Sequence, residues 1–306
     1  MDGDIKLFFH TQFTSLVKNR SDCDLTEDWP SSSDIEILCK KAAGFFIYAS
    51  TVVKFVMLSK NHMPTQQLHQ ITSLPQSMFH EGRSGMDILY SQVLNQAVDS
   101  VDLDGKEPNS NFRTVVGAVL LVFDPLSVET LSDLLGVPSV STTLRPLHSL
   151  LLVPVSKVAP IHIFHKSFPD FLMDPKRCTD YQFFIDPPVQ HREILLSCFN
   201  IMKRRLKRDI CNLGNHVHLS EVDDLPERRM TYIGGTLGYA CQFWTNHLMS
   251  IPGNSPGIEE VQKGIDEFFT MHLPFWIEVL SLMGNLDVCI YALNYIQQWY
   301  TLVSCM

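Results

Sequence analysis

Apolar residues recur along most of this chain at the three- and four-residue spacing of an amphipathic helix. In residues 191–208 the apolar positions fall on one helical face: Leu195, Cys198, Phe199, Met202 and Leu206. The same spacing predicts helices over residues 4–18, 35–42, 226–250, 257–272 and 286–302. Residues 44–58 are apolar almost throughout, which predicts a buried core helix. The pattern as a whole predicts a mainly α fold.

The middle of the chain has a different pattern. Short helices are expected over residues 111–122, 128–135 and 142–150, with Gly136 ending the second one. The sequences LLVPV (151–155) and PIHIFH (160–165) then alternate between apolar and polar residues around a three-residue turn, which predicts a β-hairpin. Three short helices followed by a hairpin is the element order of a winged-helix domain.

Polar segments rich in Gly, Pro and Asn divide the chain. They lie at residues 80–85 and 102–111, and the second is the better candidate for a domain boundary. We therefore expect a helical lid domain over 1–105, a winged-helix domain with a small hairpin over 106–180, and a second helical domain over 181–306. A shorter break at 29–34 offers Ser33 or Asp34 as the cap of the next helix.

Composition excludes several classes of protein. The 306 residues carry a formal charge of −9, whereas nucleic-acid-binding proteins are usually basic. The eight cysteines have no paired metal spacing, which favours buried thiols in a reducing compartment. The N-terminus has no signal-peptide pattern, and the apolar run 44–58 is too short for a membrane span and contains Lys54. We expect a soluble, cytoplasmic protein with no membrane or nucleic-acid partner and no metal.

Four motifs suggest chemistry but are better explained structurally. AVLLVFD (118–124) resembles a Walker B strand, but no G-x-x-x-x-G-K-[ST] loop accompanies it, so we place Asp124 at the end of a helix. IGGTLG (233–238) is interpreted as a close helix contact, and the basic run 203–208 as a solvated helix face. His216 and His218 form an HxH pair, which is a weak signal for a metal site. We interpret this segment as a polar loop instead.

DNA binding is the least favoured use of a winged helix here. The expected reading helix, TTLRPLHSL (142–150), holds one arginine and a proline, and the hairpin turn offers only Lys157. Direct readout of the major groove needs several polar or basic groups on one helix face.

His165 is the main candidate site residue. It stands where the second hairpin strand meets the next helix, 168–173, for which Ser167 and Asp170 form a predicted capping box. As an imidazolium or as a neutral N–H donor, His165 could bind a phosphate presented by another domain. The alternative is that His165 follows Ile161 and Ile163 on one strand face and closes the edge of the core.

The sequence also resembles a known family. The stretch LHSLLLVP (147–154) followed by HKSFPDFL (165–172) is similar to the winged helix of STAND-class signalling NTPases, which include NLR-like receptors. A longer series of motifs resembles the NACHT-domain proteins of mushroom-forming fungi, many of which continue into WD40 repeats: LCKKAAGFFIYASTVVKF, SFPDFLMDP, RCTDYQFFIDP, EILLSCFNIMKRRLK and TLGYACQFW.

The resemblance implies a role for His165. In the family, a winged-helix histidine contacts the β-phosphate of bound ADP and holds the switch closed, and position 165 matches it. The acid that follows this histidine in plant relatives is Lys166 here, so that part of the motif is not shared.

The family's phosphate loop and Walker B acid belong to a core expected before Asp4, and its WD40 repeats would follow Met306. The resemblance therefore implies a non-enzymatic regulatory segment that binds ADP, ATP or GTP only together with a nucleotide-binding core. A truncated gene model, a fragment and a short relative acting in trans are the alternatives. Its expected partners are a NACHT core, related STAND proteins, or an oligomer of them. A stand-alone helical interaction scaffold is the second hypothesis, and a winged-helix DNA-binding protein the third.

Overall fold

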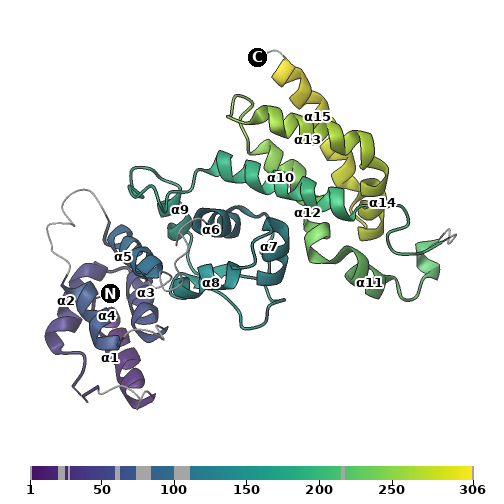
Figure 1. Ribbon diagram of the computed structural model, residues 1–306. Coiled ribbons are helices and arrows are strands. Elements are labelled where there is room, and N and C mark those ends of the chain that lie inside the picture. Colours follow the sequence, from purple (N-terminus) through teal and green to yellow (C-terminus); the bar gives the residue numbers. More distant parts are fainter. Residues whose placement is uncertain are drawn as a thin grey trace. The chain divides into compact units, whose positions relative to one another are not determined.

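The computed structural model describes residues 2–19, 25, 26, 28–58, 63–73, 84–99, 111–214 and 218–304. Within these residues the protein is mainly helical, and its one sheet has two strands (Figure 1). The mainly α prediction is therefore confirmed. None of the helices described is both long and apolar enough to cross a membrane.

The chain forms two compact units. Unit 1 comprises Met1–Phe112, Ser141–Pro154 and Ile161–Phe184, and unit 2 comprises Arg113–Val140, Val155–Pro160 and Ile185–Met306. Each unit is thus assembled from segments that are separated in the sequence. The three consecutive domains expected over 1–105, 106–180 and 181–306 stay a prediction. Of the two linkers, residues 80–83 and 102–110 lie outside the described residues.

Unit 1 is built around its N-terminal helices. Helix α1 packs against α2 and α3, and α3 also contacts α4 and α5. The stacked rings of Phe9 and Phe13, with centroids 5.9 Å apart, lie in its core. Its elements are α1 (Asp2–Asn19), α2 (Ser32–Ala42), α3 (Phe46–Leu58), α4 (Pro64–Thr72), α5 (Gly85–Asp99), most of α8 (Val140–Leu144), η3 (Arg145–Leu147), β1 (Leu151–Leu152), β2 (His162–Ile163) and α9 (Ser167–Leu172).

The cap of helix α2 lies two or three residues before the predicted caps, Ser33 or Asp34. Ser31 is the N-cap, and its hydroxyl accepts from the backbone N–H of Asp34 at 3.1 Å. The Asp34 carboxylate in turn accepts from the backbone N–H of Ser31 at 3.2 Å. Ser33 and Asp34 were wrong as caps because Asp34 is the third residue inside the helix and forms the second half of a capping box.

The predicted hairpin is present but short. Strands β1 and β2 are antiparallel, with Leu151 opposite Ile163 and Leu152 opposite His162. Pro154 and Pro160 lack the N–H that would extend the ladder, so the connection is longer than the three residues expected. Its tip lies in unit 2, where the backbone N–H of Glu129 donates to the carbonyl of Lys157 at 3.2 Å.

Helix 142–150 was predicted as one element and is in fact two. Helix α8 ends at Leu144, and Arg145–Leu147 form the 3₁₀ turn η3. Pro146 explains the break, because a proline cannot donate the backbone hydrogen bond that an α-helix needs at that position.

Unit 2 is centred on the pair α10 and α12. Helices α7 and α13 pack against α10, whereas α14 and α15 contact α12. Trp244, Phe268 and Trp276 form an aromatic core, and the indole N–H of Trp276 donates to the Cys241 carbonyl at 2.8 Å. Its elements are α6 (Phe112–Leu121, from Arg113), α7 (Val128–Leu135), α10 (Pro187–Arg205), η4 (Leu219–Glu221), α11 (Leu225–Arg228), the π-helix η5 (Arg229–Ile233), α12 (Gly234–Met249), α13 (Ile258–Met271), α14 (Leu273–Met283) and α15 (Leu286–Ser304).

The Gly-rich segment 233–238 is a close helix contact, as predicted. A Cβ at Gly235 would lie 3.0 Å from the hydroxyl of Thr130 on α7, and one at Gly238 would lie 3.4 Å from Met283 on α14. The single helix predicted over 226–250 is divided into α11, η5 and α12. The division between η5 and α12 falls at Gly234, whose φ of +61° lies outside the helical region.

Candidate functional site around His165

His165 lies at the surface of unit 1, between β2 and α9. Ile161 is buried and Ile163 half-buried, but the imidazole of His165 is exposed. Its Nδ1 lies 2.7 Å from the hydroxyl oxygen of Ser167 and accepts from the backbone N–H of Ser167 at 3.1 Å. The ring is therefore held by its own chain two residues further on.

These contacts determine which nitrogen of the neutral imidazole carries its proton. A backbone N–H can only donate, so the Nδ1 atom that it faces carries a lone pair. The single proton of a neutral imidazole then lies on Nε2. This nitrogen is left to donate a hydrogen bond away from Ser167.

Tyr90 of α5 extends this contact into the core. Its hydroxyl lies 2.7 Å from the Ser167 hydroxyl oxygen, and its ring packs against Phe168 and Phe171 with centroids 5.3 and 5.5 Å away. Burial raises the pKa of the Tyr90 phenol above its usual value. Tyr90 therefore keeps its proton and is available as a donor.

An ion pair fixes the same helix one turn earlier. Arg177 donates from Nη2 to the carboxylate of Asp87 at 2.6 Å and from Nε at 3.2 Å. Asp87 is buried, and it also caps α5 together with Ser84. A two-atom contact between a guanidinium and a buried carboxylate is geometrically specific, so it fixes α5 against the segment after α9.

The residue before His165 is held from another helix. The ammonium of Lys54 on α3 lies 3.1 Å from the centroid of the Phe164 ring. Burial lowers the pKa of Lys54. The cation–π contact anchors the chain immediately before the histidine.

One local prediction at this site was wrong. Ser167 is the first residue of α9 and not its cap. The cap position is Lys166, whose side chain makes no capping hydrogen bond. The Ser167 hydroxyl contacts Tyr90 and His165, so it cannot take the role that the capping box with Asp170 required. Ser167 was predicted to cap α9, whereas in the structure it forms hydrogen bonds with His165.

Sequence reasoning also missed Tyr90, Asp87 and Arg177. One signal was available, because Ser84 and Asp87 have the S-x-x-D spacing of a helix start. Nothing in the sequence indicated that this helix would contact residues 165–177, which lie about eighty positions away.

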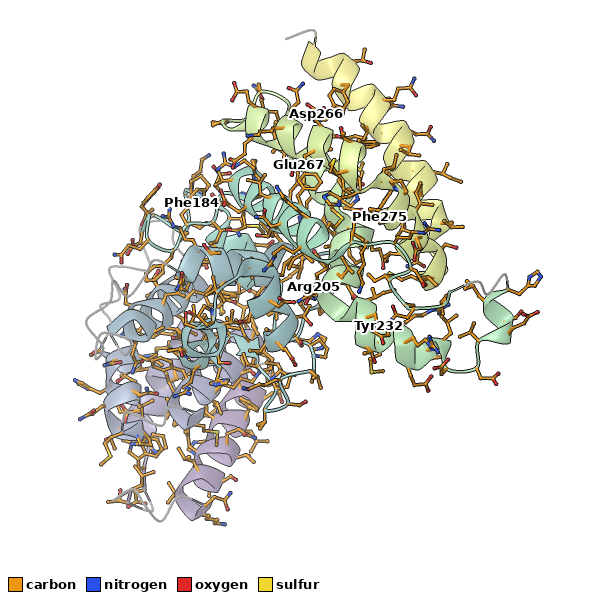
Figure 2. The ribbon with its side chains drawn as sticks, turned by 45° about the vertical axis from the view of Figure 1, so that its right-hand side comes forward. Phe184, Arg205, Tyr232, Asp266, Glu267 and Phe275 are labelled. Carbon is orange, nitrogen blue, oxygen red and sulfur yellow. The ribbon has the colours of Figure 1, made fainter. Side chains whose placement is uncertain are left out.

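The other motifs can be compared with their structural interpretation only in part: Asp124 lies three residues beyond the helix end where it was expected, and the basic run is exposed as expected. Helix α6 ends at Leu121, and Asp124 is an exposed residue of the bend that follows. The basic run at the end of α10 is exposed, and Arg205 (labelled in Figure 2) pairs with Asp133 at 2.6 Å. His216 lies outside the described residues, and among those described no cluster of three or more ligating side chains could hold a metal. The described cysteines are free thiols, and all but Cys39 are buried.

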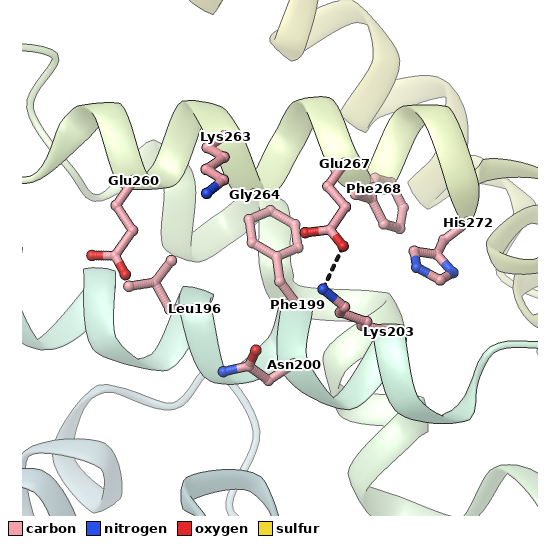
Figure 3. A pocket seen from close by; sticks show the side chains of 10 residues that line it. All are labelled: Leu196, Phe199, Asn200, Lys203, Glu260, Lys263, Gly264, Glu267, Phe268 and His272. Carbon is pink, nitrogen blue, oxygen red and sulfur yellow. Dashed lines mark ion pairs between the residues drawn. The ribbon is translucent and has the colours of Figure 1, made fainter.

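Unit 2 contains a shallow pocket of about 230 Å³ between α10 and α13. Lys203 Nζ and Glu267 Oε1 are 2.5 Å apart, and Figure 3 shows the two side chains pointing towards one another from α10 and α13. The lining of the pocket holds equal numbers of ammonium and carboxylate groups, so it favours neither an anionic nor a cationic ligand. The lining residues are Leu196, Phe199, Asn200, Lys203, Glu260, Lys263, Gly264, Glu267, Phe268 and His272.

A second histidine cluster lies inside unit 2. The Nδ1 atoms of His191 and His247 are 2.8 Å apart, and the hydroxyl of Tyr239 lies 2.8 Å from His247 Nε2. Tyr239 also accepts from the backbone N–H of Phe123 at 3.3 Å. Burial lowers the pKa of His191 to about 4, and burial together with His191 lowers that of His247 to about 3. Both rings are neutral at neutral pH and act as core residues.

No family model, curated protein or solved structure matches this chain.

Proposed function

We propose that this chain is a regulatory, non-catalytic segment of a NACHT-type STAND NTPase, and that His165 binds the phosphate of a nucleotide held by a separate core. The observation that carries the proposal is the orientation of the imidazole. Its Nδ1 is occupied by Ser167, and its ring is exposed, so Nε2–H is available to an external acceptor.

A phosphate oxygen suits this donor. A neutral Nε2–H gives one hydrogen bond to an anionic acceptor, and such charge-assisted bonds are about twice as strong as neutral ones. One donor without a cradle of backbone N–H groups or a magnesium ion binds phosphate weakly. The isolated chain is therefore proposed to lack hydrolysis and to bind ADP, ATP or GTP only feebly.

The family assignment rests on the sequence resemblance. It supplies the nucleotide, the NACHT core or related STAND proteins as partners, and a cytoplasmic location for the complex. The element order of three short helices and a hairpin between residues 112 and 163 agrees with the element order of that family's winged helix.

An interaction scaffold is the second candidate, and α15 favours it. Leu286, Ile290 and Leu293 recur on one face of this helix, and they are 45, 67 and 39% exposed. Tyr291 beside them is 51% exposed. An exposed apolar row of this kind is typical of surfaces that bind other proteins.

The release of ADP tests the proposal. The chain is joined to the NACHT core of a related fungal protein, and the dissociation of a fluorescent ADP analogue is followed with and without His165→Ala. Losing a hydrogen bond to a charged group removes about 1.5–3 kcal/mol, so we expect release to accelerate at least about tenfold.

His162→Ala is the matched control, because His162 is an exposed histidine on strand β2, three residues before His165. It should leave ADP release unchanged. Equal release rates in the wild type and both variants would contradict the sensor and leave the scaffold as the better proposal. Calorimetry of the isolated chain with ADP supplies the baseline, and micromolar affinity there would show that a complete site had been missed.

A further inference from the structure

We propose that Tyr90 is a positioning residue for His165: acting through Ser167, it holds the imidazole as a neutral Nε2–H donor and couples helix α5 to the state of that donor. The proposal rests on the proposed function only for the ligand of His165. We call the chain of contacts from Tyr90 through Ser167 to His165 the relay. Its geometry does not depend on the proposed function.

The direction of each hydrogen bond in the relay follows from the backbone N–H of Ser167, which can only donate. The backbone N–H of Ser167 faces His165 Nδ1, so that atom accepts. The Ser167 hydroxyl, 2.7 Å from the same nitrogen, must then donate its only proton to it. Because that proton is used, the contact between Ser167 and Tyr90 requires the phenol to donate.

Tyr90 is suited to be the fixed end of this relay. It is 1% exposed, and its ring packs against both Phe168 and Phe171, so the hydroxyl has little freedom to move. Burial also favours the protonated phenol. A side chain that cannot turn and does not ionise keeps the Ser167 hydroxyl pointed at His165.

The relay is one of two contacts that join α5 to the segment after β2. Asp87, one turn before Tyr90, binds Arg177, and Tyr90 binds Ser167. Both contacts join α5 to the segment between β2 and residue 177. A shift of α5 therefore releases the imidazole, and a ligand on Nε2 stabilises α5 in place.

The relay decides between the two forms of His165 that the sequence left open. An imidazolium would carry a proton on Nδ1 and would face the N–H of Ser167 with a second donor. The geometry therefore assigns recognition of the phosphate to the neutral ring.

Nitrogen-15 NMR of the histidine rings in the full chain at pH 8 tests this directly. We expect His165 to show a lone-pair shift at Nδ1 and a protonated shift at Nε2, whereas exposed His162 shows the averaged shifts of two tautomers. Ser167→Ala should move His165 towards the average. Tyr90→Phe, which keeps the aromatic packing, should move it in the same direction by less.

Tyr48→Phe is the matched control. Tyr48 is a buried tyrosine of α3 in the same unit, and its loss of a hydroxyl should leave the His165 shifts unchanged. His165 shifts that are unaffected by Tyr90→Phe would overturn the proposal. If a variant fails to fold, the wild-type spectrum still decides, because averaged shifts or a protonated Nδ1 in it refute the relay.

A second measurement separates this proposal from the proposed function. In the chain joined to a NACHT core, Tyr90→Phe and Ser167→Ala should each accelerate ADP release by less than His165→Ala. Neither should add to the effect of His165→Ala in the double variant. Shifts that follow the relay while ADP release does not respond would reject the sensor and retain the positioning role. Full additivity in the double variants would reject the coupling.

Discussion

Histidine side chains in this protein occupy two opposite environments. His165 is exposed and keeps one nitrogen available, whereas His191 and His247 are buried and bind one another. In the buried pair, the Tyr239 hydroxyl accepts from the backbone N–H of Phe123 and also lies 2.8 Å from His247 Nε2. The facing Nδ1 atoms of the two rings form one hydrogen bond, in which one imidazole donates and the other accepts. The same residue type is thus a surface donor in one place and a core element in the other.

The buried pair makes unit 2 sensitive to acid. Each ring has a folded pKa below the ordinary value near 6.5, so below that pH the unfolded chain binds more protons than the folded one. The free energy of unfolding should fall by up to about 1.4 kcal/mol per pH unit for each ring between pH 6.5 and 4. Denaturation followed by the fluorescence of Trp244 and Trp276 at several pH values measures this.

The variant His191→Gln should reduce that pH dependence by about half, since one titrating ring remains. Exposed His162→Gln is the control and should leave it unchanged. Asp124 and Cys198, which act on Tyr239, are the other titratable groups that face the network. An unchanged slope in His191→Gln would show that the pair does not control acid unfolding.

At the scale of single elements, glycine sets how closely helices approach. A Cβ at Gly264 of α13 would lie 2.8 Å from a ring carbon of Phe199 on α10. Figure 3 shows the Phe199 ring beside Gly264, between the two helices. Only a residue without a side chain allows this contact.

Gly264→Ala should therefore destabilise unit 2. Overpacking costs about 1–3 kcal/mol, against a gain of about 1 kcal/mol in helix propensity. We expect a net loss of about 1 kcal/mol in the free energy of unfolding, measured by chemical denaturation. Gly3→Ala in α1, where no atom lies within 4 Å of the added Cβ, should be neutral or stabilising. A stabilised Gly264→Ala protein would refute the close contact.

Three helices escaped the sequence pattern: α4, α5 and α14. Helix α4 is nine residues long and polar apart from its buried face, and α14 is apolar on nearly every side. Helix α14 therefore lacks the contrast between faces that a periodicity argument needs, and α4 is too short to repeat its contrast over several turns. Helix α5 begins at the end of a polar segment that was interpreted as a linker.

For the whole molecule, charge is the property that separates candidate partners. The net charge of −9 repels nucleic-acid phosphates, and Lys203 and Arg205 of the basic run are paired with Glu267 and Asp133. We expect no salt-dependent retention of the chain on duplex DNA at physiological ionic strength. Retention that weakens with added salt, and is lost when Arg204 and Arg208 are replaced by Gln, would favour the DNA-binding alternative.

The sequence by itself determined the mainly α fold, the hairpin, the limits of α7 and the close contact at Gly235 and Gly238. These features depend on side-chain spacing, proline and glycine within a few residues, and such local preferences act before the chain folds. Only the tertiary structure decided that Tyr90 reaches Ser167, that Asp87 binds Arg177, and that His191 and His247 are hydrogen-bonded to one another. Such pairs lie 56 to 90 positions apart, and their geometry comes from the packing of whole helices.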